Sequence, residues 1–211
     1  MKSPKIIIII IIIIFISAFL IWLYLASTKP LPGTEALQEG RDHLAEGTKI
    51  DYQFNPPTSG NHYASWISKG FYGEPRADGN LIHSLEHGYI IFWYDCDRKV
   101  TSYMQQGIVG TAYAQASNMT AGSEGSVSAK LSDMPPSFSD GSCDNFKNQI
   151  KNQIQKNNPH KIIAIPRIGM DSPLILTAWG RMEKLNSIDE QKIKEFIDAF
   201  RDNGPERTVE D

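Results

Sequence analysis

The sequence has few of the residues that build metal sites or nucleic-acid surfaces. Among 211 residues there are 5 histidines and 2 cysteines, and 24 acidic side chains outnumber 21 basic ones. Without a basic patch the chain lacks the surface that nucleic-acid binding needs, so we expect no nucleic acid among its partners. No internal repeat is visible, and no feature names a protein partner. The length and composition suit one globular domain with a sizeable core.

Charge is absent from one long segment near the N-terminus. The run from Ile6 to Ala26 spans roughly 30 Å as a helix at about 1.5 Å per residue, which predicts a transmembrane helix. Lys2 and Lys5 precede it, so the positive-inside bias places the N-terminus in the cytoplasm. A cleaved signal peptide ending near Ala26 is the alternative. The apolar run exceeds the roughly 7–15 residues of a signal region, which favours an uncleaved single-pass anchor in the cell membrane.

These observations predict a simple domain organisation. We expect a cytoplasmic N-terminus at 1–5, a transmembrane anchor at 6–27, a linker at 28–39, one extracytoplasmic domain at 40–206 and a tail at 207–211. Residues 101–142 are rich in glycine and serine and read as an insertion in that domain. In an oxidising compartment Cys96 and Cys143 are most simply a disulfide, with a thiolate metal ligand or two free buried thiols as alternatives.

Hydrophobic periodicity predicts an α+β fold. The segments are a short strand at 50–54, a buried strand at 89–94, a helix ending near 157, strands at 161–165 and 174–179 joined as an antiparallel pair, and a last helix after a capping box at 187–190. Together they indicate a small mixed β-sheet covered on one face by two helices, preceded by the N-terminal transmembrane helix.

Three histidines lie close together in the sequence. His83 and His87 are four residues apart, a spacing that lines up side chains on a helical turn. His62 follows a loop stiffened by Pro56 and Pro57. Neutral imidazole is the commonest metal ligand, so the cluster predicts a transition-metal site. The alternative is that each histidine only satisfies a buried polar group.

The metal depends on the fourth ligand, for which the candidates are Met170, His43, Glu86 and water. A thioether from Met170 would favour copper, whereas nitrogen or carboxylate donors would suit zinc. Met170 could equally fill space in the core. We favour copper over zinc, and we expect Glu86 to orient an imidazole as a hydrogen-bond acceptor.

The string from His83 to His87 also fits the inverted zinc-peptidase pattern H-x-x-E-H, in which the glutamate activates water. That pattern needs a sustained helix. Gly88 and the strand behind it end any helix at once, so we expect a short turn at a sheet edge instead. No catalytic residue is assigned, and whether the protein is an enzyme is left open.

Several motifs together resemble a known family. They are the NPPTSG loop at 55–60 with His62, the HSLEHG string at 83–88 and the TAWG strand end at 177–180, with further matches at 40–43, 169–171 and 204–206. The chain is similar to the uncharacterised family called domain of unknown function 3105 over roughly residues 40–206. The resemblance implies an N-terminal membrane anchor and places His43, His62, His83, His87 and Met170 in matching positions, but it implies no reaction. In that family the two cysteines lie close in sequence, whereas here the insertion separates Cys96 from Cys143.

Three functions follow as hypotheses. The first is a membrane-anchored extracytoplasmic domain that handles a transition metal, with copper favoured, through His62, His83 and His87 and with Met170 or His43 completing the shell. The second is an interaction or assembly module whose histidines are structural. The third is a zinc hydrolase that uses Glu86.

Overall fold

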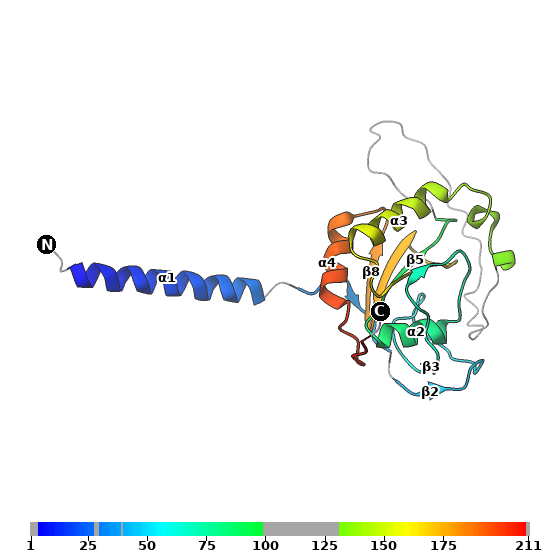
Figure 1. Ribbon diagram of the computed structural model, residues 1–211, viewed down its shortest axis with the longest axis horizontal. Helices are drawn as coiled ribbons and strands as arrows, with labels where there is room; N and C mark the ends of the chain where they lie inside the picture. The colour runs from blue at the N-terminus through cyan, green and yellow to red at the C-terminus, as the bar shows by residue number, and fades with distance from the viewer. Residues whose placement is uncertain (1–3, 28–29, 39, 99–130, 210–211) are drawn as a thin grey trace. The chain divides into compact units, whose positions relative to one another are not determined.

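The computed structural model describes residues 4–27, 30–38, 40–98 and 131–209 (Figure 1). They belong to two compact units, Met1–Leu31 and Pro32–Asp211. The first unit is the helix α1 (Pro4–Ser27), and its segment Pro4–Leu25 has the length and apolar composition of a membrane span or of a signal sequence. The expected apolar helix is therefore present.

The second unit is built on a mixed sheet of six strands. Its order is β1 (Thr34–Glu35), β8 (Arg181–Leu185), β7 (Leu174–Ala178), β5 (Ile90–Tyr94), β6 (Ile162–Pro166) and β4 (Gly70–Phe71). The strands β4, β5 and β6 are parallel, whereas β7 runs antiparallel to β5 and to β8. A second small sheet pairs β2 (His43–Leu44) with β3 (His62–Tyr63) in parallel.

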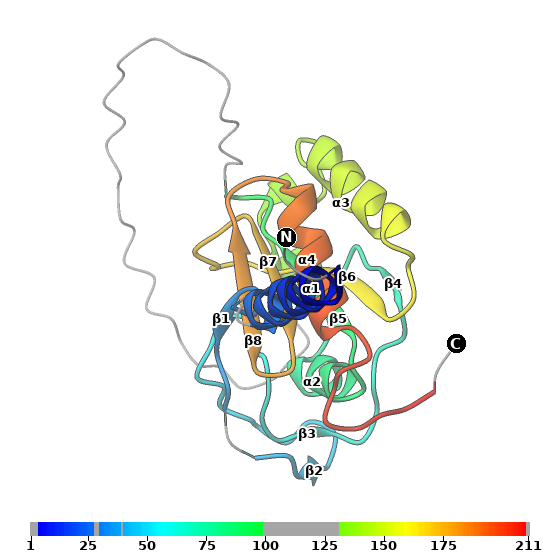
Figure 2. The same ribbon diagram turned by 90° about the vertical axis from the view of Figure 1, so that its left-hand side faces the viewer.

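The sheet is buried on both faces because β5 is apolar at every position. Side chains alternate along a strand, so Phe92 belongs to one core cluster and Trp93 to the other. The helices α3 (Asp144–Lys156) and α4 (Glu190–Phe200) cover the first face, and α2 (Asp78–Glu86) covers the opposite one (Figures 1 and 2). The predicted mixed sheet with two helices on one face is confirmed, and α2 adds a third layer.

The two large helices form where the periodicity predicts them. Phe146, Ile150 and Ile154 turn one face of α3 into the core. Asp189 is the N-terminal cap of α4, and its carboxylate accepts the Lys192 N–H at 3.0 Å. The cap therefore lies two residues after Ser187, where the expected capping box begins.

Four details of the sequence reading are wrong. Residues 50–54 form no strand, because the Asp51 carbonyl and the Gln53 N–H bond to the Gln38 side chain and not to a neighbouring strand. The strands β6 and β7 do not pair with each other, since β5 lies between them. The strand β8 went unpredicted, because only Met182 and Leu185 are buried in it and this spacing lacks the period of two.

The fourth correction concerns the centre of the site. His83 lies in the last turn of a nine-residue helix, α2, and not in a short turn. Gly88 does end the helix, with φ at +81°, and His87 forms its C-terminal cap. The helix extends from the histidines toward the N-terminus and begins at Asp78.

The expected disulfide joins Cys96, just after β5, to Cys143, the residue that precedes α3. It closes the base of the predicted insertion. Most of that insertion, residues 101–130, lies outside the described part of the chain. Its last residues form two 3-10 turns, Leu131–Asp133 and Pro136–Phe138, of which Phe138 packs into the core.

Candidate metal centre

Three short elements bring the histidines together. In the pair of β2 and β3, His43 lies opposite His62, so both side chains leave the ladder on the same face. The α2 helix packs against β3 and supplies His83. This close approach depends on Gly79 of α2, where a Cβ atom would lie only 2.6 Å from the Tyr63 ring.

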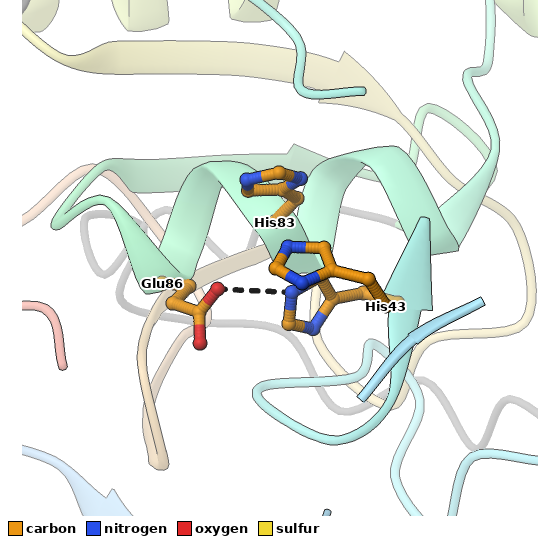
Figure 3. Close-up of side chains that lie close together, drawn as sticks. His43, His83 and Glu86 are labelled. Carbon is orange, nitrogen blue, oxygen red and sulfur yellow. Dashed lines mark ion pairs between the residues drawn. The ribbon is translucent and has the colours of Figure 1, made fainter. Parts of the chain in front are cut away.

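The rings of His43, His62 and His83 form a nearly equilateral triangle. Their centroids lie 4.7 Å, 4.9 Å and 5.0 Å apart. Two imidazoles bound to one tetrahedral ion through bonds of about 2.1 Å have centroids roughly 5 Å apart. Figure 3 shows His43 and His83 beside Glu86. One ligand atom from each of these three residues and one from His62 all lie within 4.8 Å of one another. The group therefore has the dimensions of a metal site.

Backbone carbonyls fix the direction of two imidazoles. The Nδ1 atom of His62 lies 2.9 Å from the Gly60 carbonyl, and that of His83 lies 2.7 Å from the Tyr63 carbonyl. A carbonyl oxygen can only accept, so each Nδ1 carries the proton and the lone pair of a neutral ring is on Nε2. Metal-binding histidines are oriented in this way by acceptors behind them.

Burial also keeps one ring neutral. The pKa of His83 is lowered, first because burial penalises the charged imidazolium and then because His87, His62 and His43 surround it, against the opposing effect of the Tyr63 carbonyl. A neutral ring is the form that binds a metal.

Glu86 faces His62 across a short gap. Its Oε2 atom lies 2.9 Å from Nε2 of His62, and this is the contact drawn as a dashed line in Figure 3. The two side chains are 1% and 0% exposed. The atoms are too poorly aligned for a hydrogen bond, and neither has another partner among the described residues. Two buried acceptors that face each other at this distance repel unless a cation lies between them, either a proton on the imidazole or a metal ion.

The other oxygen of Glu86 is held by an arginine. The Arg41 Nε donates to Oε1 at 2.6 Å, and the guanidinium lies 6.0 Å from the centre of the Trp179 ring. Sequence reasoning missed Arg41, although it stands two residues before His43 in a matching family motif. The sequence carried no signal for its pairing with Glu86, which is 45 residues away.

A second group of ligand atoms shares His83. It contains His87 and Glu206, again with one atom from each residue within 4.8 Å of the others. The Nε2 atoms of His83 and His87 are 3.0 Å apart, and Nε2 of His87 lies 3.3 Å from Oε2 of Glu206. The ring of Trp66 flanks this group, 5.3 Å from that of His87.

The segment that carries Glu206 is fixed against the end of α2. The Asp202 N–H donates to the Gly88 carbonyl and the Glu206 N–H donates to the Glu86 carbonyl, both at 3.0 Å. The buried ammonium of Lys161 donates to the carbonyls of His87 and Thr208 at 2.9 Å and 2.8 Å. The only sequence signal for Glu206 was its place in the family motif at 204–206.

The structure thus brings His43, His62, His83 and His87 together with Glu86. The fifth histidine, His160, lies elsewhere and faces Asp202 at 3.3 Å. Met170 is fully buried in the apolar cluster that contains Leu81, Leu85 and Trp93. Met170 therefore occupies the kind of space-filling core position that the sequence analysis gave as the alternative to a ligand. Its role as a metal ligand stays a prediction.

Comparison with known proteins gives a family and no function. A family model described as "Protein of unknown function (DUF3105)" matches residues 43–119 and 138–211. Searches of the curated proteins and of the solved structures found no match. The matched ranges contain all the histidines and both carboxylates of the two groups.

Proposed function

We propose that this chain, which belongs to the DUF3105 family, is a membrane-anchored extracytoplasmic protein that binds a divalent transition metal through His43, His62, His83 and Glu86. The observation that supports this most is the buried pair of His62 and Glu86, whose facing acceptors lie 2.9 Å apart without a hydrogen bond. A metal ion between them would turn a repulsive contact into two bonds. Its role would be metal handling.

The donor set suits Cu²⁺ and Zn²⁺ alike. Imidazole binds both ions, and a carboxylate completes zinc sites readily. The preference for copper rests on a thioether from Met170, which here is packed among apolar side chains. The metal content of the full-length protein, purified in detergent without chelators, decides between the two ions.

The binding test uses the full-length protein in detergent, stripped of metal and titrated with Zn²⁺ and with Cu²⁺. His62→Ala should bind at least one equivalent fewer than the wild type, whereas His160→Ala should bind as much. His43→Ala is a second variant, because this exposed side chain can be removed without disturbing the core. If both site variants bind metal as the wild type does, the proposal is wrong.

Thermal unfolding of the same samples separates this function from an interaction module with structural histidines. A ligand at 100 times its Kd stabilises the folded state by about 2.7 kcal/mol, so loaded protein should melt at a higher temperature than stripped protein. A purely structural cluster would leave the melting temperature unchanged.

A further inference from the structure

We propose that the site holds two metal ions, the second bound by His83, His87 and Glu206. This inference rests on the proposed function, because it divides the same cluster of histidines. The second ion would be a divalent transition metal of the same class as the first.

His83 decides how the ligands divide between two ions, because it belongs to both groups of candidate ligands. Its Nδ1 atom is committed to the Tyr63 carbonyl, so only Nε2 can bind a metal. The single lone pair on Nε2 of His83 can bind only one ion. The cluster therefore holds either one ion that uses His83 or two ions of which only one does.

With His83 assigned to the second ion, both ions keep a complete set of ligands. The first retains His43, His62 and Glu86. The second has His83, His87 and Glu206. Each set contains two imidazoles and one carboxylate, a ligand set that proteins use for divalent transition metals with open positions for water or a further ligand.

Two of the three distances in the second set fit a shared ion. Donor atoms on one tetrahedral ion lie roughly 3.3 to 3.4 Å apart when the bonds are about 2.0 to 2.1 Å. The observed separations are 3.0 Å from His83 to His87 and 3.3 Å from His87 to Glu206. A chain of hydrogen bonds through the Nε2–H group of His87 would give similar distances, so the number of bound ions is the decisive measurement.

Glu206 is well placed to be a ligand because hydrogen bonds hold the backbone of its segment. Hydrogen bonds from Asp202 to Gly88 and from Glu206 to Glu86 fix the segment on the end of α2. The carboxylate itself remains 49% exposed. The second ion would therefore bind next to solvent, whereas the Glu86 carboxylate of the first site is 1% exposed.

The test counts copper in the full-length, metal-stripped protein in detergent. Titration with Cu²⁺ should reach two equivalents. Ions in two-metal sites lie about 3.5 to 4 Å apart, so their unpaired electrons should couple, and the electron paramagnetic resonance (EPR) signal should account for fewer spins than copper atoms. Glu206→Gln should bind one equivalent fewer and give an uncoupled signal. Glu195→Gln, which changes an exposed carboxylate on α4, should behave as the wild type does.

His87→Ala is a second variant with the same expected loss of one equivalent and of the coupling. A wild type that binds one equivalent overturns the two-ion inference and leaves the proposed function standing. A wild type that binds none overturns both. Two equivalents without spin coupling, or two that persist in Glu206→Gln, would mean that the second copper binds elsewhere and would overturn the inference.

Discussion

At the scale of single residues, Arg41 sets the direction of the buried Glu86 carboxylate. Its Nε donates to Oε1 at 2.6 Å and leaves Oε2 facing His62. Residues that orient metal ligands typically change affinity by about 10- to 100-fold when removed. We therefore expect Arg41→Ala to weaken metal binding by roughly that factor, measured by competition with a chelator of known affinity.

Arg76→Ala is the matched control for this variant. Arg76 also places its guanidinium over an aromatic ring, 5.1 Å from the centre of Tyr72. It has no contact with the site in the described residues, so its removal should leave the affinity unchanged. Equal affinities for wild type and Arg41→Ala would argue that Glu86 is not a ligand.

The sequence allowed the imidazoles and Glu86 to be named as candidates, but not Arg41 and Glu206. His62, His83 and His87 are recognisable because residue type and local spacing suffice to identify a cluster. Arg41 and Glu206 reach the site only through packing between distant segments, which local patterns do not encode. Met170 is a different case: its soft donor lies in a family motif and its side chain packs in the apolar core, so its role as a ligand stays a prediction.

At the scale of elements, the segment from Asp202 to Glu206 depends on a close approach at Gly204. A Cβ atom at this position would lie 2.0 Å from the Glu86 carbonyl oxygen and 2.4 Å from the Gly88 nitrogen. Both are backbone atoms at the end of α2 and cannot move aside cheaply. Gly204→Ala should therefore displace the segment and destabilise the protein by about 1–3 kcal/mol, seen in chemical unfolding.

The same variant should lose the second copper equivalent while the first remains, because Glu206 moves with the segment. Gly73→Ala controls for the loss of glycine flexibility, since an added Cβ there meets nothing within 4 Å. Gly204→Ala with unchanged stability and two bound coppers would show that the segment is not needed to position Glu206.

Elements were predictable where apolar residues formed a regular stripe or an unbroken run. The α3 and α4 helices each present a regular apolar stripe, and β5 is apolar throughout. The α2 helix was missed because it is buried on nearly all sides and its residues Gly79, His83, Ser84 and Glu86 are polar or small. His83 and Glu86 face the site, so polar residues of the site interrupt the apolar periodicity of the helix.

At the scale of the whole molecule, the apolar helix α1 and the disulfide both bear on where the second unit lies. The segment Pro4–Leu25 can span a membrane by length and composition, and lysines at 2 and 5 precede it. The bond between Cys96 and Cys143 is of a kind that persists in oxidising compartments. Both features support a domain on the outer side of the membrane.

Proteolysis of oriented membrane vesicles tests this orientation with the full chain. In right-side-out vesicles, added protease should remove the domain, whereas in inside-out vesicles the membrane should protect it. A maleimide-linked polymer supplies an independent check: it should add no mass to the denatured protein until a reductant is present, and then two labels, one for each cysteine. A domain that is protected in right-side-out vesicles and labelled without reductant would place the metal site in the cytoplasm, where thiols are kept reduced.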